Sequence, residues 1–183
     1  MFKDKKVIIF DMDGTLIDSV GMWNKTDETL IKKFTNKNID EFFSENDIQA
    51  KDIGQMRDSI LAKCKSGDIY LEYCSWLKEK FKTDTPAEEI LKSRWNIANE
   101  YIINEVDYKE DADILLKKLK ENGYILVLAT TTTKYRLDIY RKKLKKADIG
   151  KIFTVILSKE DVEHKKPSPE IHNKIMKKLN VTP

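Results

Sequence analysis

The amino-acid sequence predicts an α/β protein, with a parallel-sheet core that is interrupted by an all-helical subdomain. Three apolar runs, at residues 6–11, 124–129 and 153–158, are continuous rather than alternating, which is typical of strands buried on both faces. A helical pattern precedes the second and the third run, and strands that alternate with helices form parallel sheets. The stretch between residues 20 and 105 shows helical periodicity and no strand-like run.

The elements of the core can be placed along the chain. We expect the first run, Lys6 to Asp11, to be a central strand of the sheet. Before the second run, Asp111 can cap a helix that Asn122-Gly123 would end. Amphipathic patterns at residues 137–144 and 169–179 then predict two further helices. These helices would make the crossovers between parallel strands.

The boundaries of the helical stretch divide the chain into two domains. Residues 1–19 and 106–183 form the predicted α/β core, and residues 20–105 form the helical insertion. The last helix of the insertion has a clear beginning at Thr85-Pro86-Ala87-Glu88, which combines a capping-box pattern with an early proline. We interpret the aromatic residues of the insertion as core packing rather than as a cofactor site.

Composition excludes several classes of protein. Charged residues make up 36% and hydrophobic residues 40%, and 34 basic against 31 acidic residues leave a net charge of +3. This balance does not predict a nucleic-acid partner. Every apolar run is far shorter than the roughly 20 residues that span a bilayer, and the first is too short for a signal peptide. We therefore expect a cytoplasmic protein without a membrane partner.

The segment Asp11-Met12-Asp13-Gly14-Thr15 carries the clearest chemical signal. It lies at the carboxyl end of the first strand, where ligand sites of parallel sheets are found. Residues two apart on an extended segment point to the same side, so Asp11 and Asp13 can face one pocket, while Gly14 permits a sharp turn. A turn-capping role is the alternative. It would not compensate the desolvation cost of placing two carboxylates at the end of an apolar strand.

Three motifs together resemble those of the haloacid dehalogenase superfamily. Asp11-Met12-Asp13-Gly14-Thr15-Leu16 resembles its first motif. Leu126 to Thr130, an apolar strand that ends in a hydroxyl residue, is similar to the second motif, and Lys166-Pro167-Ser168-Pro169-Glu170 is similar to the third. Their order and separations agree over essentially the whole chain. The resemblance implies a Rossmann-like core.

The insertion after the first motif matches the helical cap of the superfamily's β-phosphoglucomutase-like branch. Asp18-Ser19 matches a dipeptide that is common in that branch. Trp23, however, stands where the mutases of the branch carry a histidine. We therefore rank phosphomutase activity below phosphatase activity.

The resemblance implies a role for each site residue. Asp11 would be the nucleophile that is transiently phosphorylated, and Asp13 the general acid and base. A carboxylate that attacks a phosphate dianion meets like-charge repulsion, so the site needs cations and donors; Lys166 and Thr130 can supply them. Magnesium would bind the side chain of Asp11 and the backbone carbonyl of Asp13. The expected contacts to the substrate are completed by Gly14, Thr15 and Thr131.

The fourth motif of the superfamily, an acidic pair that completes the magnesium site, is not in this sequence. We therefore expect a C-terminally shortened member that lacks the last strands of the core, binds magnesium weakly and has impaired activity. Glu160 or Asp161 could complete the metal site, although a solvated loop is the simpler interpretation for both. The first strand would lose a neighbour, and its exposed edge would permit self-association.

The predicted function is that of a magnesium-dependent phosphatase acting on a small phosphorylated metabolite. The alternative is a non-catalytic protein of the same fold that binds a phosphate ligand or a partner. A dehalogenase ranks low because Asp13 suits a leaving group that needs a proton, which halide does not. His164 and His172 have no nucleophile nearby in the sequence, and we interpret them as surface residues.

Overall fold

The computed structural model describes residues 5–64 and 67–182, and it divides the chain into two compact units. The core unit combines the chain up to residue 20 with the part from residue 105 onward, and the helical unit covers residues 21–104. In the described part of both units, no helix is long and apolar enough to cross a bilayer.

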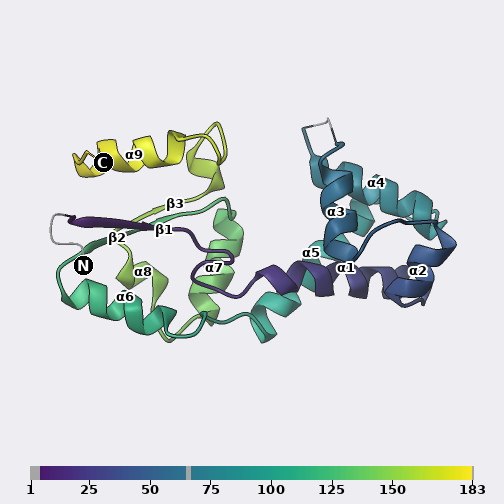
Figure 1. Ribbon diagram of the computed structural model, residues 1–183, viewed down its shortest axis with the longest axis horizontal. Helices are drawn as coiled ribbons and strands as arrows, with labels where there is room; N and C mark the ends of the chain where they lie inside the picture. Colours follow the sequence, from purple (N-terminus) through teal and green to yellow (C-terminus); the bar gives the residue numbers. More distant parts are fainter. Residues whose placement is uncertain (1–4, 65–66, 183) are drawn as a thin grey trace. The chain divides into compact units, whose positions relative to one another are not determined.

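The core unit is built on three parallel strands in the order β1-β2-β3 (Figure 1). They are β1 (Val7–Phe10), β2 (Ile125–Ala129) and β3 (Val155–Leu157). In the register of the sheet, Val7 lies beside Ile125, and Val127 lies beside Val155. The three apolar runs of the sequence thus form the parallel sheet of an α/β fold, which confirms the predicted fold class.

The central strand is β2 and not β1, so the expectation that the first run is central was wrong for the described strands. β2 is almost completely buried, whereas all four residues of β1 are only half-buried. A continuous apolar run indicates that both faces of a strand are covered, but it carries no information about its hydrogen-bonding edges. Among the described strands, β1 pairs with β2 alone.

Helices cover both faces of the sheet (Figure 1). On one face, α9 (Glu170–Leu179) packs Ile171 and Ile175 against Val127 and Val155. The other face carries α6 (Ala112–Glu121) and α8 (Ile149–Ile152). The remaining long helix of the unit, α7 (Lys134–Lys143), follows the loop at the end of β2. The sheet is therefore the middle layer of three. Packing on both of its faces holds the strands, and with them their carboxyl ends, in place.

Helix α6 begins where the sequence predicted, but Asp111 does not cap it. Asp111 has a left-handed backbone (φ 60°) and its side chain makes no capping hydrogen bond. Side-chain caps act from an extended residue, as Thr133 does for α7 by accepting a bond from the N–H of Arg136. The predicted end of α6 is confirmed, since Asn122 is the C-cap and Gly123 follows with a φ of 80°.

The described residues of the helical unit form helices and no strand. The helices are α1 (Val20–Thr35), α2 (Ile39–Glu45), α3 (Ile53–Leu61), α4 (Ile69–Phe81) and α5 (Ala87–Asn104). Their apolar faces meet in one core that includes Leu30, Phe42, Leu77 and Ile90. The rings of Phe34 and Phe81 stack against each other at its edge. The aromatic residues of this part of the chain are thus largely core residues.

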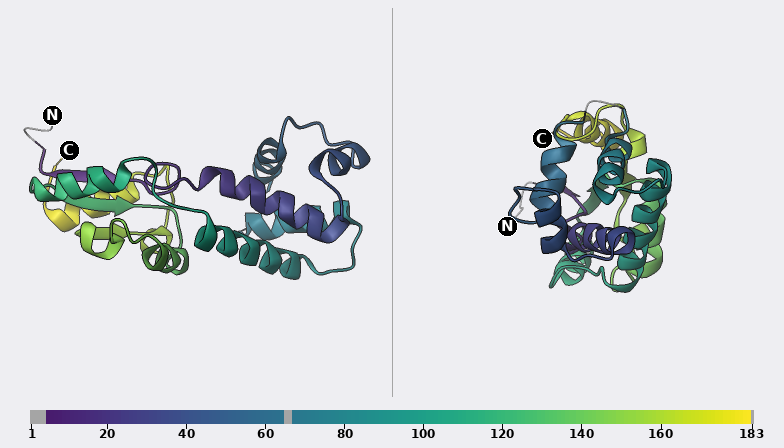
Figure 2. Two further views of the ribbon diagram at one scale, coloured as in Figure 1. Left: turned by 90° about the horizontal axis from the view of Figure 1, so that it is seen from below. Right: turned by 90° about the vertical axis from the view of Figure 1, so that its right-hand side faces the viewer.

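A buried ion pair joins α1 to α5, which lie side by side (Figure 2). The Nε of Arg94 is 2.6 Å from Oδ1 of Asp27, and both side chains are almost completely buried. Arg57 on α3 also donates to Asp27, at 3.2 Å. Aromatic rings surround the guanidinium with their centroids 4.9–5.7 Å from Cζ; they belong to Trp23, Tyr70, Tyr73 and Trp95.

The loop between β3 and α9 is held by Asp161. A short 3-10 helix, η1 (Lys159–Asp161), follows Ser158, whose N–H and hydroxyl both donate to the Asp161 carboxylate. Lys134, at the start of α7, lies 2.9 Å from the same carboxylate. Burial alone would raise the pKa of Asp161, but the bonds from Lys134 and Ser158 outweigh it and lower the pKa to about 2.

We predict that Asp161→Asn destabilises the core unit at neutral pH but much less in acid. A carboxyl group with a lowered folded-state pKa stabilises the fold above its unfolded pKa of about 3.9, and this contribution is lost as the pH falls through the folded value. The difference in unfolding free energy should be about 1–2 kcal/mol at pH 7 and should shrink between about pH 4 and pH 2. Urea unfolding followed by circular dichroism measures it. A difference that does not change with pH would contradict this account.

Candidate active site

Two carboxylates lie at the carboxyl end of β1. Asp11 and Asp13 are half-exposed, while Met12 between them is buried with 1% of its surface exposed. This alternation is the one that the sequence predicted for an extended segment. The chain then turns at Gly14, which has a φ of 74° and whose missing Cβ would lie 3.0 Å from Cγ2 of Val20. The position therefore suits glycine alone.

Lys166 reaches Asp11 from the loop that precedes α9. Its Nζ is 2.5 Å from Oδ1 of Asp11 and also donates to the backbone carbonyl of Ala129, at 3.2 Å, where β2 ends. The side chains of Lys166 and Asp11 keep 26% and 39% of their surface exposed, so an incoming ligand can reach both. Residues that are 155 positions apart are thus brought together, as the resemblance implied.

Asp13 is held by three hydroxyl groups. Its Oδ1 accepts hydrogen bonds from Ser19 at 2.7 Å and from the phenol of Tyr140 at 3.2 Å. Its Oδ2 accepts a bond from the hydroxyl of Thr132. Three donors on its two oxygens hold the carboxyl group of Asp13 in one orientation.

The sequence did not identify these three donors as site residues. Ser19 was noticed only as part of a family dipeptide, and within the run from Thr130 to Thr133 the expected site residues were Thr130 and Thr131, not Thr132. Tyr140 falls on the buried face of α7, where periodicity predicts an ordinary core residue. Its position after the second motif carries no signal of a contact with Asp13.

The remaining predicted residues surround this centre with different degrees of exposure. Thr130 is buried: its N–H donates to Leu157 at 3.0 Å, and its hydroxyl oxygen accepts from the N–H of Thr132 at 3.0 Å. That geometry leaves the hydroxyl proton of Thr130 available for donation. Thr15 and Thr131 are exposed.

Tyr140 keeps its phenolic proton and acts as a hydrogen-bond donor. Its burial, together with the charge of Asp13, raises its pKa well above the ordinary value for tyrosine. The phenol therefore keeps its proton and directs it to Oδ1 of Asp13.

The charge of the site favours a divalent cation. Asp11, Asp13 and Lys166 together carry a net charge of −1, which would repel a phosphate dianion. Magnesium takes oxygen ligands, commonly one or two carboxylates with water and substrate phosphate, so the side chain of Asp11 together with the backbone carbonyl of Asp13 fits it. No group of three acidic, histidine or cysteine side chains that could hold a metal occurs in the described residues.

The two acidic residues that could have completed a metal site have other contacts. Glu160 accepts a hydrogen bond from the N–H of Lys134 at 3.1 Å, and Asp161 is held by Ser158 and Lys134. Both carboxylates therefore fasten the loop after β3 to the start of α7. Asp11 and Asp13 are left as the acidic pair at the carboxyl end of β1.

Known proteins share this fold and sequence pattern. Pyrophosphatase PpaX of Bacillus velezensis is 28% identical over 182 residues, which cover 98% of this chain and 72% of PpaX. The structure of CbbY from Rhodobacter sphaeroides in complex with phosphate has a TM-score of 0.61 and 22% identity, covering 98% of this chain and 74% of CbbY. YfnB from Bacillus subtilis, bound to magnesium, has a TM-score of 0.65 and 15% identity, covering 94% and 73%.

The family assignment rests on nearly the whole sequence. A family model for haloacid dehalogenase-like hydrolases matches residues 5–183, a range that contains both aspartates, Thr130 and Lys166. The chain belongs to the haloacid dehalogenase-like hydrolases.

Proposed function

We propose that the protein is a magnesium-dependent phosphatase that acts on a small phosphorylated metabolite. The observation that carries this proposal is the contact between Lys166 and Asp11, an exposed carboxylate beside the hydroxyl-bound Asp13. This arrangement offers a nucleophile, a cation and a proton-transfer group at one edge of the sheet. The names of two relatives, a pyrophosphatase and a protein solved with phosphate, agree with a phosphorylated ligand.

In the first step, a carboxylate oxygen of Asp11 attacks phosphorus, and the bond between phosphorus and the leaving oxygen breaks. Asp13, in its protonated form, gives a proton to the departing alcohol oxygen. In the second step, Asp13 takes a proton from a water molecule whose oxygen attacks the aspartyl phosphate. Inorganic phosphate leaves, and Asp11 is a free carboxylate again.

The other residues offset the charge that both steps develop. Lys166 places a positive charge beside Asp11, and the hydroxyl of Thr130 can donate to a phosphoryl oxygen. Gly14, Thr15 and Thr131 would complete the contacts to the phosphoryl group. A magnesium ion held by Asp11 and the backbone carbonyl of Asp13, when bound, would supply charge stabilisation to the phosphoryl oxygens.

A non-catalytic protein that binds a phosphate ligand is the main alternative, and formation of a phosphoenzyme separates the two. Phosphomutase activity ranks lower because Trp23 replaces the histidine that is expected in that branch. Its indole packs edge-on against Trp95, with ring centroids 5.8 Å apart. Dehalogenation ranks lower because it has no use for the proton of Asp13.

We also propose that two copies associate through the edge of β1 that no other described strand covers. Next to this edge lies a hollow of about 750 Å³, lined in part by Val7 and Ile9 of β1 and by Met176 of α9. Antiparallel pairing centred on Ile8 would place Lys5, at the basic start of one β1, beside Asp11 at the acidic end of the other.

Activity should depend on Asp11 as the nucleophile. Asp11→Asn is nearly isosteric, so the fold should survive, while hydrolysis of a phosphate ester should fall by roughly 10³-fold or more. The aspartyl phosphate can be trapped by acid quench after reaction with labelled acetyl phosphate and identified by its cleavage with hydroxylamine. The control is Asp138→Asn, whose carboxylate lies on the surface of α7 with 66% of its area exposed. A phosphoenzyme that persists in Asp11→Asn would exclude this nucleophile.

A pair of neighbouring lysines tests the role of the cation. Lys166→Met should weaken binding of inorganic phosphate and reduce turnover by roughly 100-fold, because nothing else in the described site neutralises Asp11. Lys165→Met makes the same change at an exposed neighbour and should leave both quantities unchanged. Phosphate affinity can be measured by isothermal titration calorimetry. Equal losses in the two variants would show that the effect comes from net charge and not from the contact with Asp11.

Association through β1 predicts dimers whose population rises with protein concentration in sedimentation velocity. Lys5→Glu should shift the population to monomers, since in the proposed pairing Lys5 lies opposite the partner's Asp11. Lys6→Glu makes the same charge change one residue away, on the other side of the strand, and should have a smaller effect. A wild-type protein that stays monomeric at all concentrations would rule out this interface.

A further inference from the structure

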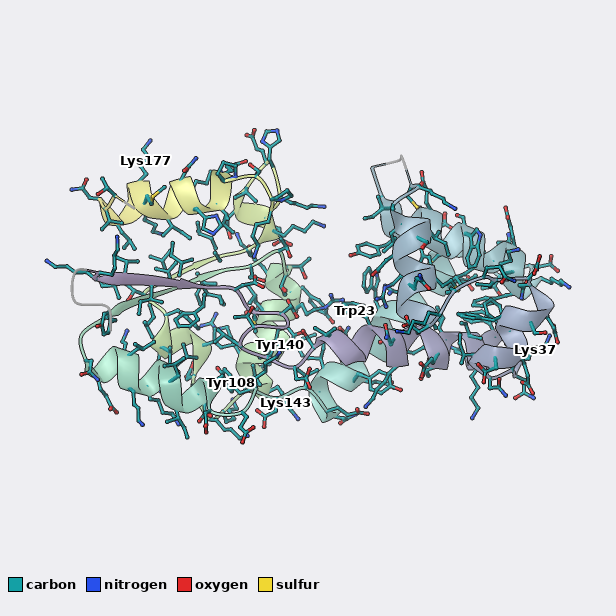
Figure 3. All side chains as sticks on the ribbon, in the orientation of Figure 1. Trp23, Lys37, Tyr108, Tyr140, Lys143 and Lys177 are labelled. Carbon is teal, nitrogen blue, oxygen red and sulfur yellow. The ribbon has the colours of Figure 1, made fainter. Side chains whose placement is uncertain are left out.

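Tyr140 lies on the buried face of α7, as a core residue would, but its hydroxyl also contacts a residue of the candidate active site. Figure 3 shows Tyr140 on α7. Its side chain is completely buried, and its hydroxyl is directed at Oδ1 of Asp13. The hydroxyl lies at the end of a rigid ring on α7, whereas the other two donors to Asp13, Ser19 and Thr132, belong to loops. Tyr140 is therefore the donor that connects Asp13 to a regular element of the fold.

The packing of α7 fixes the position of this hydroxyl. Leu137 and Leu144 lie three residues before and four residues after Tyr140, and both are buried as well. Movement of the tyrosine ring would therefore disturb the core. The oxygen that Tyr140 contacts is the one that Ser19 also contacts, while Thr132 holds the other oxygen. Donors on both oxygens restrict rotation of the carboxylate about its last torsion angle.

We propose that Tyr140 is a positioning residue that aims the carboxyl group of Asp13 for proton transfer. The inference rests on the proposed phosphatase function and extends it to a residue that does not touch the substrate. Asp13 has to reach the leaving oxygen in one step and a water molecule in the next, and small errors in position reduce the rate of proton transfer strongly. Holding the carboxylate from a buried helix face keeps that error small.

The test compares two buried tyrosines of the core unit. Tyr140→Phe removes the hydroxyl that contacts Asp13, and Tyr108→Phe removes a hydroxyl that donates to the backbone carbonyl of Ala147 at 2.5 Å. Each substitution removes one buried hydrogen bond and keeps the aromatic ring. With an alkyl phosphate ester, we expect Tyr140→Phe to lower kcat by about tenfold with KM changed less than twofold. Tyr108→Phe should leave both constants unchanged.

The leaving group and a double mutant then separate positioning from a structural defect. Phosphoenzyme formation measured by rapid quench should slow about tenfold with an alkyl ester but less than threefold with p-nitrophenyl phosphate, whose leaving group needs no proton. In an Asp13→Asn background, Tyr140→Phe should cause no further loss. Equal losses for both esters, or a further loss in that background, would overturn the inference.

A spectroscopic measurement tests the contact without turnover. In protein with ¹³C-labelled tyrosine, the hydroxyl proton of Tyr140 should give a resolved low-field resonance that is absent from Tyr140→Phe, lost in Asp13→Ala and retained in Tyr108→Phe. A resonance that is unchanged in Asp13→Ala would overturn the contact itself. A wild-type protein that forms no phosphoenzyme would contradict the proposed function. An active wild-type protein whose Tyr140→Phe and Tyr108→Phe variants have the same kcat would overturn this inference alone.

Discussion

The ion pair between Lys166 and Asp11 is the interaction on which the rest of the site depends. A carboxylate cannot approach a phosphate dianion while its own charge is uncompensated, and at short range this repulsion is large outside bulk water. The fold supplies the compensation from a distant part of the sequence, because the loop before α9 returns to the carboxyl ends of β1 and β2. The parallel sheet matters to the chemistry because it puts both groups at one edge.

The two aspartates are separated by one buried residue, yet their surroundings differ. Asp11 has a cation and solvent beside it, while Asp13 has three hydroxyl groups. In the proposed mechanism, the cation beside Asp11 offsets its charge during attack on phosphate, whereas the hydroxyl donors orient the carboxyl group of Asp13 for proton transfer. This difference in environment supports the proposal that identical side chains take different roles, and the alternation around Met12 keeps them close together.

Some of this could be predicted from the sequence because it depends on local patterns. Apolar runs gave the three strands, and the spacing of Asp11 and Asp13 gave the side to which they point. The apolar pattern of β1 does not show which of its edges is paired, because both edges of a strand consist of backbone. The loss of a neighbour beside β1 was expected from the family resemblance alone. The donors to Asp13 could not be predicted either. Tyr140 satisfies the periodicity of a core residue, and tertiary packing alone decides that its hydroxyl contacts Asp13. Asp111 shows the reverse case, in which a favourable residue type has an unsuitable backbone conformation.

Trp23, which stands where the mutases of the branch carry a histidine, packs against a buried ion pair of the helical unit. A buried arginine carries a large desolvation cost, which Arg94 offsets with Asp27 and with the faces of four aromatic rings, one of them that of Trp23. An imidazole in this position would present less aromatic surface to the guanidinium, and its positive form would be repelled by it. The indole therefore fits the core of this helical unit better than a histidine would, and this agrees with the proposal that ranks hydrolysis above phosphomutase activity.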